Sequence, residues 1–233
     1  METIRTLALA ALAACPLSMS SAQAATVYLN ADNISVSVGA GTSPGTFNNT
    51  VSASGFATLA EAIGKVIDAP SATASEDHTQ ASHIWFTATS LGGGLELIFD
   101  FGVSYDITTL HFWNYAFNNF SVDQVDFSFF NSVGALIGTQ TINPLPSGSE
   151  SNITAQDYAL VSPLNTRSVV AFLTGDNRQV DFQNIGFTAD VSDPTLDPDF
   201  EPSPVPLPAS AFLLTAALGG LVAMRRKNAG KRL

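Results

Sequence analysis

Short runs of β-branched and aromatic residues recur through the middle of the chain, and turn-forming residues separate them. Alternation is clearest at Val125, Phe127 and Phe129, which share one face of an extended segment, while Asp126 and Ser128 fall on the other. The apolar set therefore predicts core positions. The predicted strands are 27–29, 34–38, 83–87, 95–99, 108–113, 122–130, 135–141, 168–173 and 180–188.

Turn signals between these runs set the expected fold class. Clusters of Gly, Asn, Ser and Pro occur at 41–45 and 143–148, and only residues 57–65 have a helical composition. Many short strands broken by such clusters are typical of an all-β sandwich or barrel. We expect one all-β domain over residues 25–190.

The first 24 residues have the pattern of a cleavable secretory signal. Arg5 precedes an apolar stretch at 7–14, and the small-residue site Ala-Gln-Ala follows at 22–24. Cys15, the single cysteine, allows an alternative, because Leu-Ala-Ala-Cys at 12–15 resembles a lipobox in which the cysteine carries a lipid. In either case the domain itself has no disulfide and no thiolate metal site.

The C-terminal end combines a linker with a potential membrane span. Residues 191–204 are acidic and proline-rich, as expected of an extended linker. The next 20 residues, 205–224, carry no charge, and as a helix they would be about 30 Å long, enough to cross a bilayer core. A basic cluster follows at 225–227, which predicts a cytoplasmic C-terminus with the domain outside.

This tail resembles the VPLPA variant of the PEP-CTERM sorting signal. The matching residues are Val205, Pro206, Leu207, Pro208 and Ala209, followed after the apolar stretch by Arg225, Arg226 and Lys227. The resemblance implies recognition by an exosortase, a membrane protease, in bacteria that make exopolysaccharide. We therefore expect an exported protein that passes through the secretion machinery and is anchored in the membrane at least transiently. An ordinary single-span anchor would share the topology and differ only in whether the tail is cut.

Charge narrows the range of partners. Residues 25–204 contain 19 acidic and 3 basic residues, a net charge of −16. Such a surface repels nucleic-acid phosphates and anionic lipid headgroups. Nucleic acid is excluded as a partner, whereas divalent cations and neutral sugars remain possible.

The order of the central segments resembles a discoidin, or coagulation-factor C-type, domain, a jelly roll of the galactose-binding-like superfamily. The resemblance spans about 53–189 and rests most on Asp-Phe-Gly at 100–102 and Trp-Asn-Tyr at 113–115. It implies a jelly-roll β-sandwich, followed here by the transmembrane sorting helix. It also implies a structural calcium ion at Asp68, with Asp77 and Asn184 as further ligands, although Ala69 and Asn184 replace the glycine and glutamate common in the family.

A search for catalytic chemistry finds no constellation in the sequence. The histidines His78, His83 and His111 make no HExxH pair, and in an extended chain the five-residue spacing would place His78 and His83 on opposite faces. Gly-Thr-Ser-Pro-Gly at 41–45 matches the letters of a G-x-S-x-G nucleophile elbow, but it lies in a turn cluster and no predicted helix directly follows it, as such an elbow requires. We therefore expect no enzyme and a surface or pocket-wall role for each histidine.

Three aromatic residues are candidates for stacking on a sugar ring: Trp85, Trp113 and Tyr115. The favoured interpretation is a non-catalytic module on the cell surface or in the extracellular matrix that binds polysaccharide, with exopolysaccharide as its partner. A structural or adhesive matrix protein without a specific glycan is the alternative, and an envelope hydrolase is the least favoured.

Overall fold

The computed structural model describes residues 25–51, 55–117 and 119–191. The predicted signal peptide, most of the linker from residue 192 onward and the whole sorting tail lie outside the described residues. Within the described ranges, no helix combines the length and hydropathy that a membrane span requires.

Strands dominate the described part of the chain, as the alternation predicts. They are β1 (Thr26–Leu29), β2 (Ser35–Val38), β3 (Gly45–Phe47), β4 (Ser75–Glu76), β5 (Ile84–Ala88), β6 (Gly94–Asn114), β7 (Gln124–Phe130), β8 (Leu136–Ile142), β9 (Ile153–Thr154), β10 (Gln156–Thr174) and β11 (Gln179–Val191). Each predicted strand overlaps one of them, and β6 joins two predicted strands into one of 21 residues.

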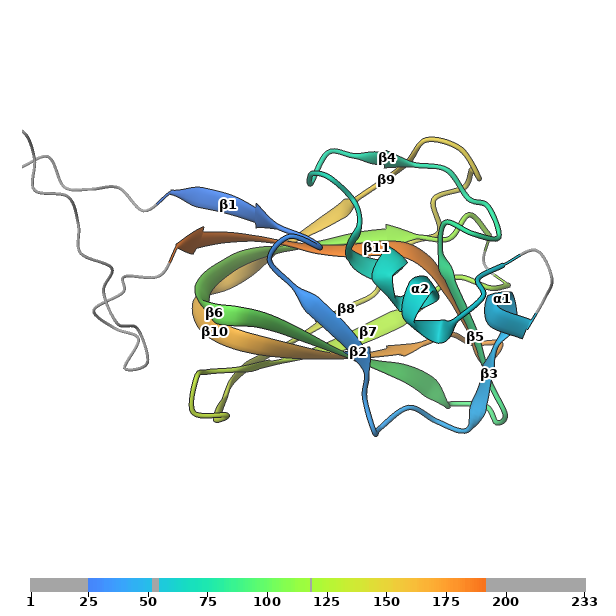
Figure 1. Ribbon diagram of the computed structural model, residues 1–233, viewed down its shortest axis with the longest axis horizontal. Helices are drawn as coiled ribbons and strands as arrows, with labels where there is room; N and C mark the ends of the chain where they lie inside the picture. The colour runs from blue at the N-terminus through green and yellow to red at the C-terminus, as the bar shows by residue number, and fades with distance from the viewer. Residues whose placement is uncertain (1–24, 52–54, 118, 192–233) are drawn as a thin grey trace, which may run out of the picture. The chain divides into compact units, whose positions relative to one another are not determined.

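Two long strands fold one continuous sheet into two layers. The nine-stranded sheet has the order β3-β5-β11-β6-β10-β7-β8, with β1 beside β11 and β2 beside β6. Strand β2 pairs with the first half of β6, at 97–100, whereas β11 pairs with its second half, at 105–114. Strand β10 pairs with both halves. Figure 1 shows β6 and β10 curving together from one layer into the other, so the predicted all-β sandwich is confirmed.

The core lies between the two layers and is rich in phenylalanine. Phe99, in the first half of β6, contacts Phe187 of β11 at a ring-centroid distance of 5.4 Å. Phe112 of β6 stacks on Phe182 of β11, also at 5.4 Å. The predicted core set of β7 is confirmed, because Val125, Phe127 and Phe129 are at most 1 % exposed. Burial of these large side chains is the main stabilising contribution.

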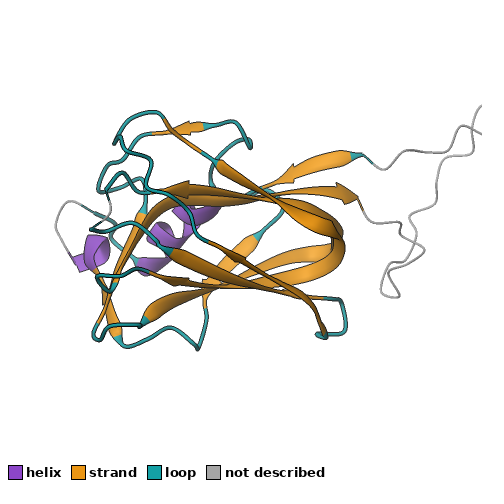
Figure 2. Cartoon of the chain, turned by 180° about the vertical axis from the view of Figure 1, so that it is seen from behind, coloured by secondary structure: helices purple, strands orange, loops and turns teal. Residues whose placement is uncertain are grey.

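Within the described ranges, the helical segments lie at one edge of the sandwich. The segments are α1 (Asn48–Val51), α2 (Leu59–Gly64) and the 3₁₀ turn η1 (Lys65–Ile67). Thr58 and Glu61 form a capping box, in which each side chain accepts a hydrogen bond from the other residue's backbone N–H. Figure 2 shows these short helices beside the strands. The helix predicted at 57–65 is thus present, and α1 was not predicted.

The corner of β6 is built around Asp100 and Gly102. Gly102 has φ +73°, a left-handed conformation that glycine adopts without steric cost. The Asp100 carboxylate accepts hydrogen bonds from the Gly102 N–H (2.9 Å) and from Nε of Arg167 on β10 (3.1 Å). The Gly102 N–H, followed by Arg167, lowers the pKa of Asp100. The Asp-Phe-Gly step is therefore the point at which both long strands turn.

Replacing Gly102 with alanine tests this corner. No atom lies within 4 Å of the added Cβ, so the cost comes from the left-handed backbone alone, and we expect a loss of about 1–2 kcal/mol of unfolding free energy. Gly64→Ala is the matched control, because its site is equally open but has φ −59°, and it should leave stability unchanged or raise it by about 0.5 kcal/mol. Urea unfolding of both variants measures the difference. Equal effects would contradict the account.

Candidate functional site

A small hollow lies where the loop before β5, the segment after β6 and strand β11 meet. Its volume is about 110 Å³, and it is lined by His78, Gln80, Trp85, Tyr115, Phe120 and Asp181. We refer to it as the hollow. Ligand pockets for small molecules typically measure about 300–1,000 Å³. A bound molecule would therefore lie across the hollow and not be enclosed by it.

Aromatic rings form one wall of the hollow. Trp85 and Phe120 meet edge to face at 5.9 Å, and Phe120 meets Tyr115 at 6.0 Å. Phe117 extends the row, with its ring 5.7 Å from that of Tyr115. Phe120 is 36 % exposed and Phe117 50 % exposed, whereas Tyr115 is nearly buried. Large aromatic side chains gathered at the surface are uncommon in a monomer and mark a candidate contact surface.

Hydrogen bonds fix this wall in place. The Trp85 indole N–H donates to Oε1 of Gln179 at 2.8 Å, which orients the ring. Asn114 is fully buried at the end of β6. Its Oδ1 accepts from the N–H groups of Tyr115 (2.9 Å) and Val122 (3.0 Å), and its Nδ2 donates to Val122 O (2.9 Å). One amide thus ties both ends of the segment that carries Phe117 and Phe120.

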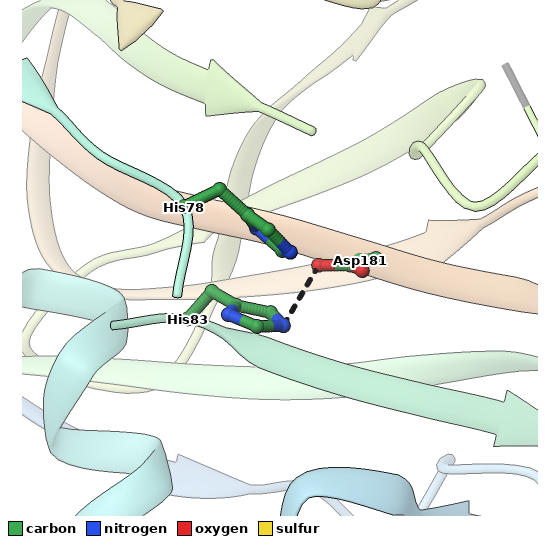
Figure 3. A group of neighbouring side chains, drawn as sticks. All are labelled: His78, His83 and Asp181. Atoms are coloured by element: carbon green, nitrogen blue, oxygen red, sulfur yellow. Dashed lines mark ion pairs between the residues drawn. The ribbon is translucent and has the colours of Figure 1, made fainter. Parts of the chain in front are cut away.

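A buried polar group lies at the base of the hollow. His78, His83 and Asp181 place one ligand-type atom each within 4.8 Å of one another, the only such group of His, Cys, Asp or Glu in the described part of the chain. We name it the His–Asp cluster. Figure 3 shows the two imidazoles directed toward the Asp181 carboxylate. His83 directly precedes β5, and Asp181 lies on β11 opposite Trp85 of β5.

The His83–Asp181 pair is buried without full hydrogen bonding. The Nδ1 of His83 is 2.5 Å from the carbonyl oxygen of Thr79, so Nδ1 carries the proton and Nε2 presents a lone pair. Nε2 is 3.4 Å from Oδ1 of Asp181. Neither atom has a hydrogen-bond partner, although the two residues are 0 % and 3 % exposed. Buried polar atoms left unpaired in this way call for a physical explanation.

Burial acts against a charged pair. It lowers the pKa of His83 to about 3, with a smaller contribution from His78, and it raises the pKa of Asp181 well above its ordinary value. Both shifts have the same cause, loss of hydration of the charged form. His83 is therefore neutral at physiological pH.

His78 completes the cluster from the partly exposed side. Its ring lies 4.0 Å from that of His83 and 4.4 Å from that of Tyr115. Nδ1 is 2.8 Å from Nε2 of Gln183, a fully buried residue of β11. Burial lowers the pKa of His78 as well. The prediction that His78 and His83 lie on opposite faces is wrong, because a turn with a Ser82 N–H to Thr79 O bond replaces the extended chain between them.

The three predicted sugar-stacking residues do not lie together. Trp85 and Tyr115 both line the hollow. Trp113 is 0 % exposed and its indole N–H donates to Ala74 O at 3.0 Å. The alternation along β6 directs this side chain into a second small core, where it packs with Ala69 and Ile153. Trp113 therefore offers no face to a ligand.

The predicted calcium residues are only partly brought together. Nδ2 of Asn184 is 3.3 Å from Oδ1 of Asp68, and Asn184 Oδ1 accepts from Ala69 N–H at 3.0 Å. Lys65 forms an ion pair with Asp68 at 2.8 Å. Asp77 instead accepts from the N–H of Asn152 at 3.0 Å. Calcium binding at Asp68, with Asp77 and Asn184 as further ligands, stays a prediction.

Several site residues were missed at the sequence level. Phe117 and Phe120 stand in the polar turn Phe-Asn-Asn-Phe, where an aromatic side chain has no strand face to bury it. That mismatch is a signal for exposed aromatics. The role of Asp181 depends on strand pairing with β5, which spacing along the sequence does not report.

Comparisons with known proteins find similar solved structures at low sequence identity. No family model matches the chain, and no curated protein matches it. A family 32 CBM from Clostridium perfringens NanJ, solved with galactose, is 11 % identical, with a TM-score of 0.44 over 70 % of this chain and 99 % of that one. An F5/8 type C domain from Bacteroides fragilis is 10 % identical, with a TM-score of 0.47 over 72 % and 98 %. A Streptococcus pneumoniae fucose-binding module is 14 % identical, with a TM-score of 0.42 over 68 % and 96 %.

Replacing Asn114 with alanine tests the hydrogen bonds that its side-chain amide makes. Asn114→Ala leaves the backbone groups of Tyr115 and Val122 without their partner in a buried place, and we expect a loss of about 2–4 kcal/mol of unfolding free energy. Asn177→Ala, at an exposed asparagine, should change it by less than about 0.5 kcal/mol. Chemical denaturation measures both. A loss below 1 kcal/mol for Asn114→Ala would show that the amide network contributes little.

The protonation state of His83 predicts how the unfolding free energy of the metal-free protein depends on pH. Because its pKa is about 3 in the folded state and 6.5 ordinarily, His83 contributes stability that is lost as the pH falls from 6.5 toward 3, at up to about 1.4 kcal/mol per pH unit. The raised pKa of Asp181 acts oppositely, so the effect is measured in Asp181→Asn. Adding His83→Gln should remove this acid-side loss. An unchanged pH profile in the double variant would contradict the assignment.

Proposed function

We propose that the protein is an exported, non-catalytic polysaccharide-binding module, sorted by an exosortase to the cell surface or the extracellular matrix and associated with exopolysaccharide. The observation that carries the binding half of this proposal is the aromatic wall of the hollow. The sorting half rests on the motif at 205–227, which lies outside the described residues.

The wall has the chemistry that recognises a sugar ring. The faces of Trp85 and Phe120 carry a negative quadrupole, which attracts the electropositive C–H groups on the apolar face of a pyranose. Both rings line one small hollow, with Phe117 exposed next to them. The wall is also held by the Gln179 and Asn114 hydrogen bonds, so little conformational entropy is lost when a ligand binds.

The other wall is polar. Gln80 is exposed beside His78, and both line the hollow with Asp181. Amide and imidazole groups can donate to and accept from sugar hydroxyls. An aromatic wall facing a few polar groups is the general pattern of a small-ligand site. Because the hollow is shallow, we expect it to contact one or two residues of a polymer and to bind weakly per site.

Display on a membrane or matrix would compensate for weak single-site binding. Many copies presented to one polymer raise the effective concentration of each further contact. The net charge of −16 over residues 25–204 favours neutral or cation-bridged polysaccharides over strongly anionic ones.

Binding to extracted native exopolysaccharide and to a glycan array tests the proposal. The exported protein is purified in a detergent without a sugar headgroup, so that the detergent does not compete. We expect saturable binding by the wild type and a loss of at least about 10-fold in affinity for Trp85→Ala and for Phe120→Ala, equivalent to about 1.4 kcal/mol.

Leu91→Ala is the control, since Leu91 is 77 % exposed and lines a separate hollow of about 550 Å³. It should bind as the wild type does. Loss of binding in Leu91→Ala alone would move the site to that other hollow. Absence of saturable binding on every glycan would favour the structural matrix protein over the binding module.

A further inference from the structure

We propose that His78, His83 and Asp181 form a binding site for a zinc-class divalent cation. The proposal goes beyond glycan binding, because metal binding can be measured without any glycan. It rests on the geometry of the His–Asp cluster and on its two buried, unpartnered atoms.

The distance within the buried pair fits a shared metal ion better than a hydrogen bond. Nε2 of His83 and Oδ1 of Asp181 are 3.4 Å apart. Hydrogen bonds between N and O measure about 2.7–3.2 Å. Two ligands that each lie about 2.0–2.1 Å from a tetrahedral zinc ion are about 3.4 Å from each other. The pair already has the spacing of one edge of a zinc coordination tetrahedron.

The lone pairs are also oriented for coordination. The Thr79 carbonyl accepts the Nδ1 proton of His83, which leaves the Nε2 lone pair directed at Asp181. A ligating histidine commonly donates its other N–H to a backbone carbonyl in this way. Both His83 Nε2 and Asp181 Oδ1 have no hydrogen-bond partner within the described part of the chain, so a cation would satisfy both at once.

His78 supplies the third ligand from the rim. Its ligand atom lies within 4.8 Å of the other two, so reaching a tetrahedral edge needs a movement of at most about 1.5 Å. His78 is only half-buried and sits on a loop, which leaves room for that movement. The Gln183 amide is 2.8 Å from His78 Nδ1, and once it is flipped its oxygen can accept a hydrogen bond from the Nδ1–H.

The donor set selects the metal class. Two imidazole nitrogens and one carboxylate suit Zn²⁺ and its transition-metal neighbours, whereas Ca²⁺ and Mg²⁺ prefer oxygen ligands alone. The three residues leave a fourth position, and since His78 and Asp181 line the hollow, that position faces it. The acidic domain would raise the local cation concentration.

Isothermal titration of Zn²⁺ into the full chain, without a polyhistidine tag and after chelator treatment, tests the proposal. We expect one site per chain, no competition from Ca²⁺, and a raised Tm. Asp181→Asn and His83→Gln should each lower affinity by more than about 100-fold, the upper end of what outer-shell partners cost. Gln183→Met should lower it by about 10–100-fold.

His111→Gln is the matched control. His111 is also buried beside an aspartate, but both its nitrogens are partnered, by Asp157 Oδ1 and Thr188 Oγ1 at 2.7 Å each. It should bind Zn²⁺ as the wild type does. Circular dichroism establishes that each variant is folded, and His78→Gln at the rim provides a variant that leaves the buried pair intact.

Two results would overturn the proposal. The first is the absence of a one-to-one Zn²⁺ isotherm, which would leave a protonated Asp181 as the partner of His83. The second is Zn²⁺ binding that is unchanged in folded Asp181→Asn and His78→Gln, which would place the metal elsewhere on the acidic surface. With Co²⁺ as the probe, a visible absorption band that appears in the wild type and is lost in Asp181→Asn would support the assignment independently.

Discussion

The structure depends on the pairing of β6 with β10 along almost their whole lengths and around a shared corner. That ladder runs from Gly94–Thr174 to Phe112–Gln156, and it shifts register where both strands bend. β-Bulges of this kind interrupt the ladder locally and bend the strand, while the pairing continues on both sides. Strands β2, β7 and β11 pair directly with this ribbon, and the remaining strands of the nine-stranded sheet are added through β7, β11 or β5, so the facing core and the position of the candidate site both follow from it.

The candidate site lies at the end of the regular strand pairing of β6. Strand β6 ends at Asn114, and the segment that follows carries the exposed phenylalanines back to β11, where Phe120 O accepts from Asp181 N–H at 3.0 Å. Strand β11 thus hydrogen-bonds to Phe120 of the aromatic wall and also carries Asp181 of the His–Asp cluster. Loops positioned by a rigid sheet are common places for binding, and here the rigid part also buries the polar pair.

The sequence predicted the strands well and the site less well, for different physical reasons. Alternation at Val125, Phe127 and Phe129 reports burial directly, because neighbouring residues in a strand face opposite sides. It could not show that 95–99 and 108–113 belong to one strand, since the Gly102 corner looks like a break. The short pairs β4 and β9 carry too few residues to show any period.

Site residues depend on contacts between distant segments, and spacing alone does not report these. An extended chain would place His78 and His83 on opposite faces, yet a turn brings their ring centroids to 4.0 Å from each other. Trp85 and Trp113 have equal stacking potential as residue types, but the pairing of β6 buries one of them completely. Asp181 reaches His83 only because β11 lies beside β5.

The central claim is that the hollow bounded by Trp85, Tyr115 and Phe120 is where a polysaccharide binds. The chain has two tryptophans, one at the hollow and one fully buried, so their indole N–H signals in an NMR titration report the site directly. With oligosaccharides prepared from the native exopolysaccharide, the account predicts a saturable shift of the Trp85 indole signal while that of Trp113 stays in place. Saturable binding that leaves the Trp85 signal unmoved would contradict it.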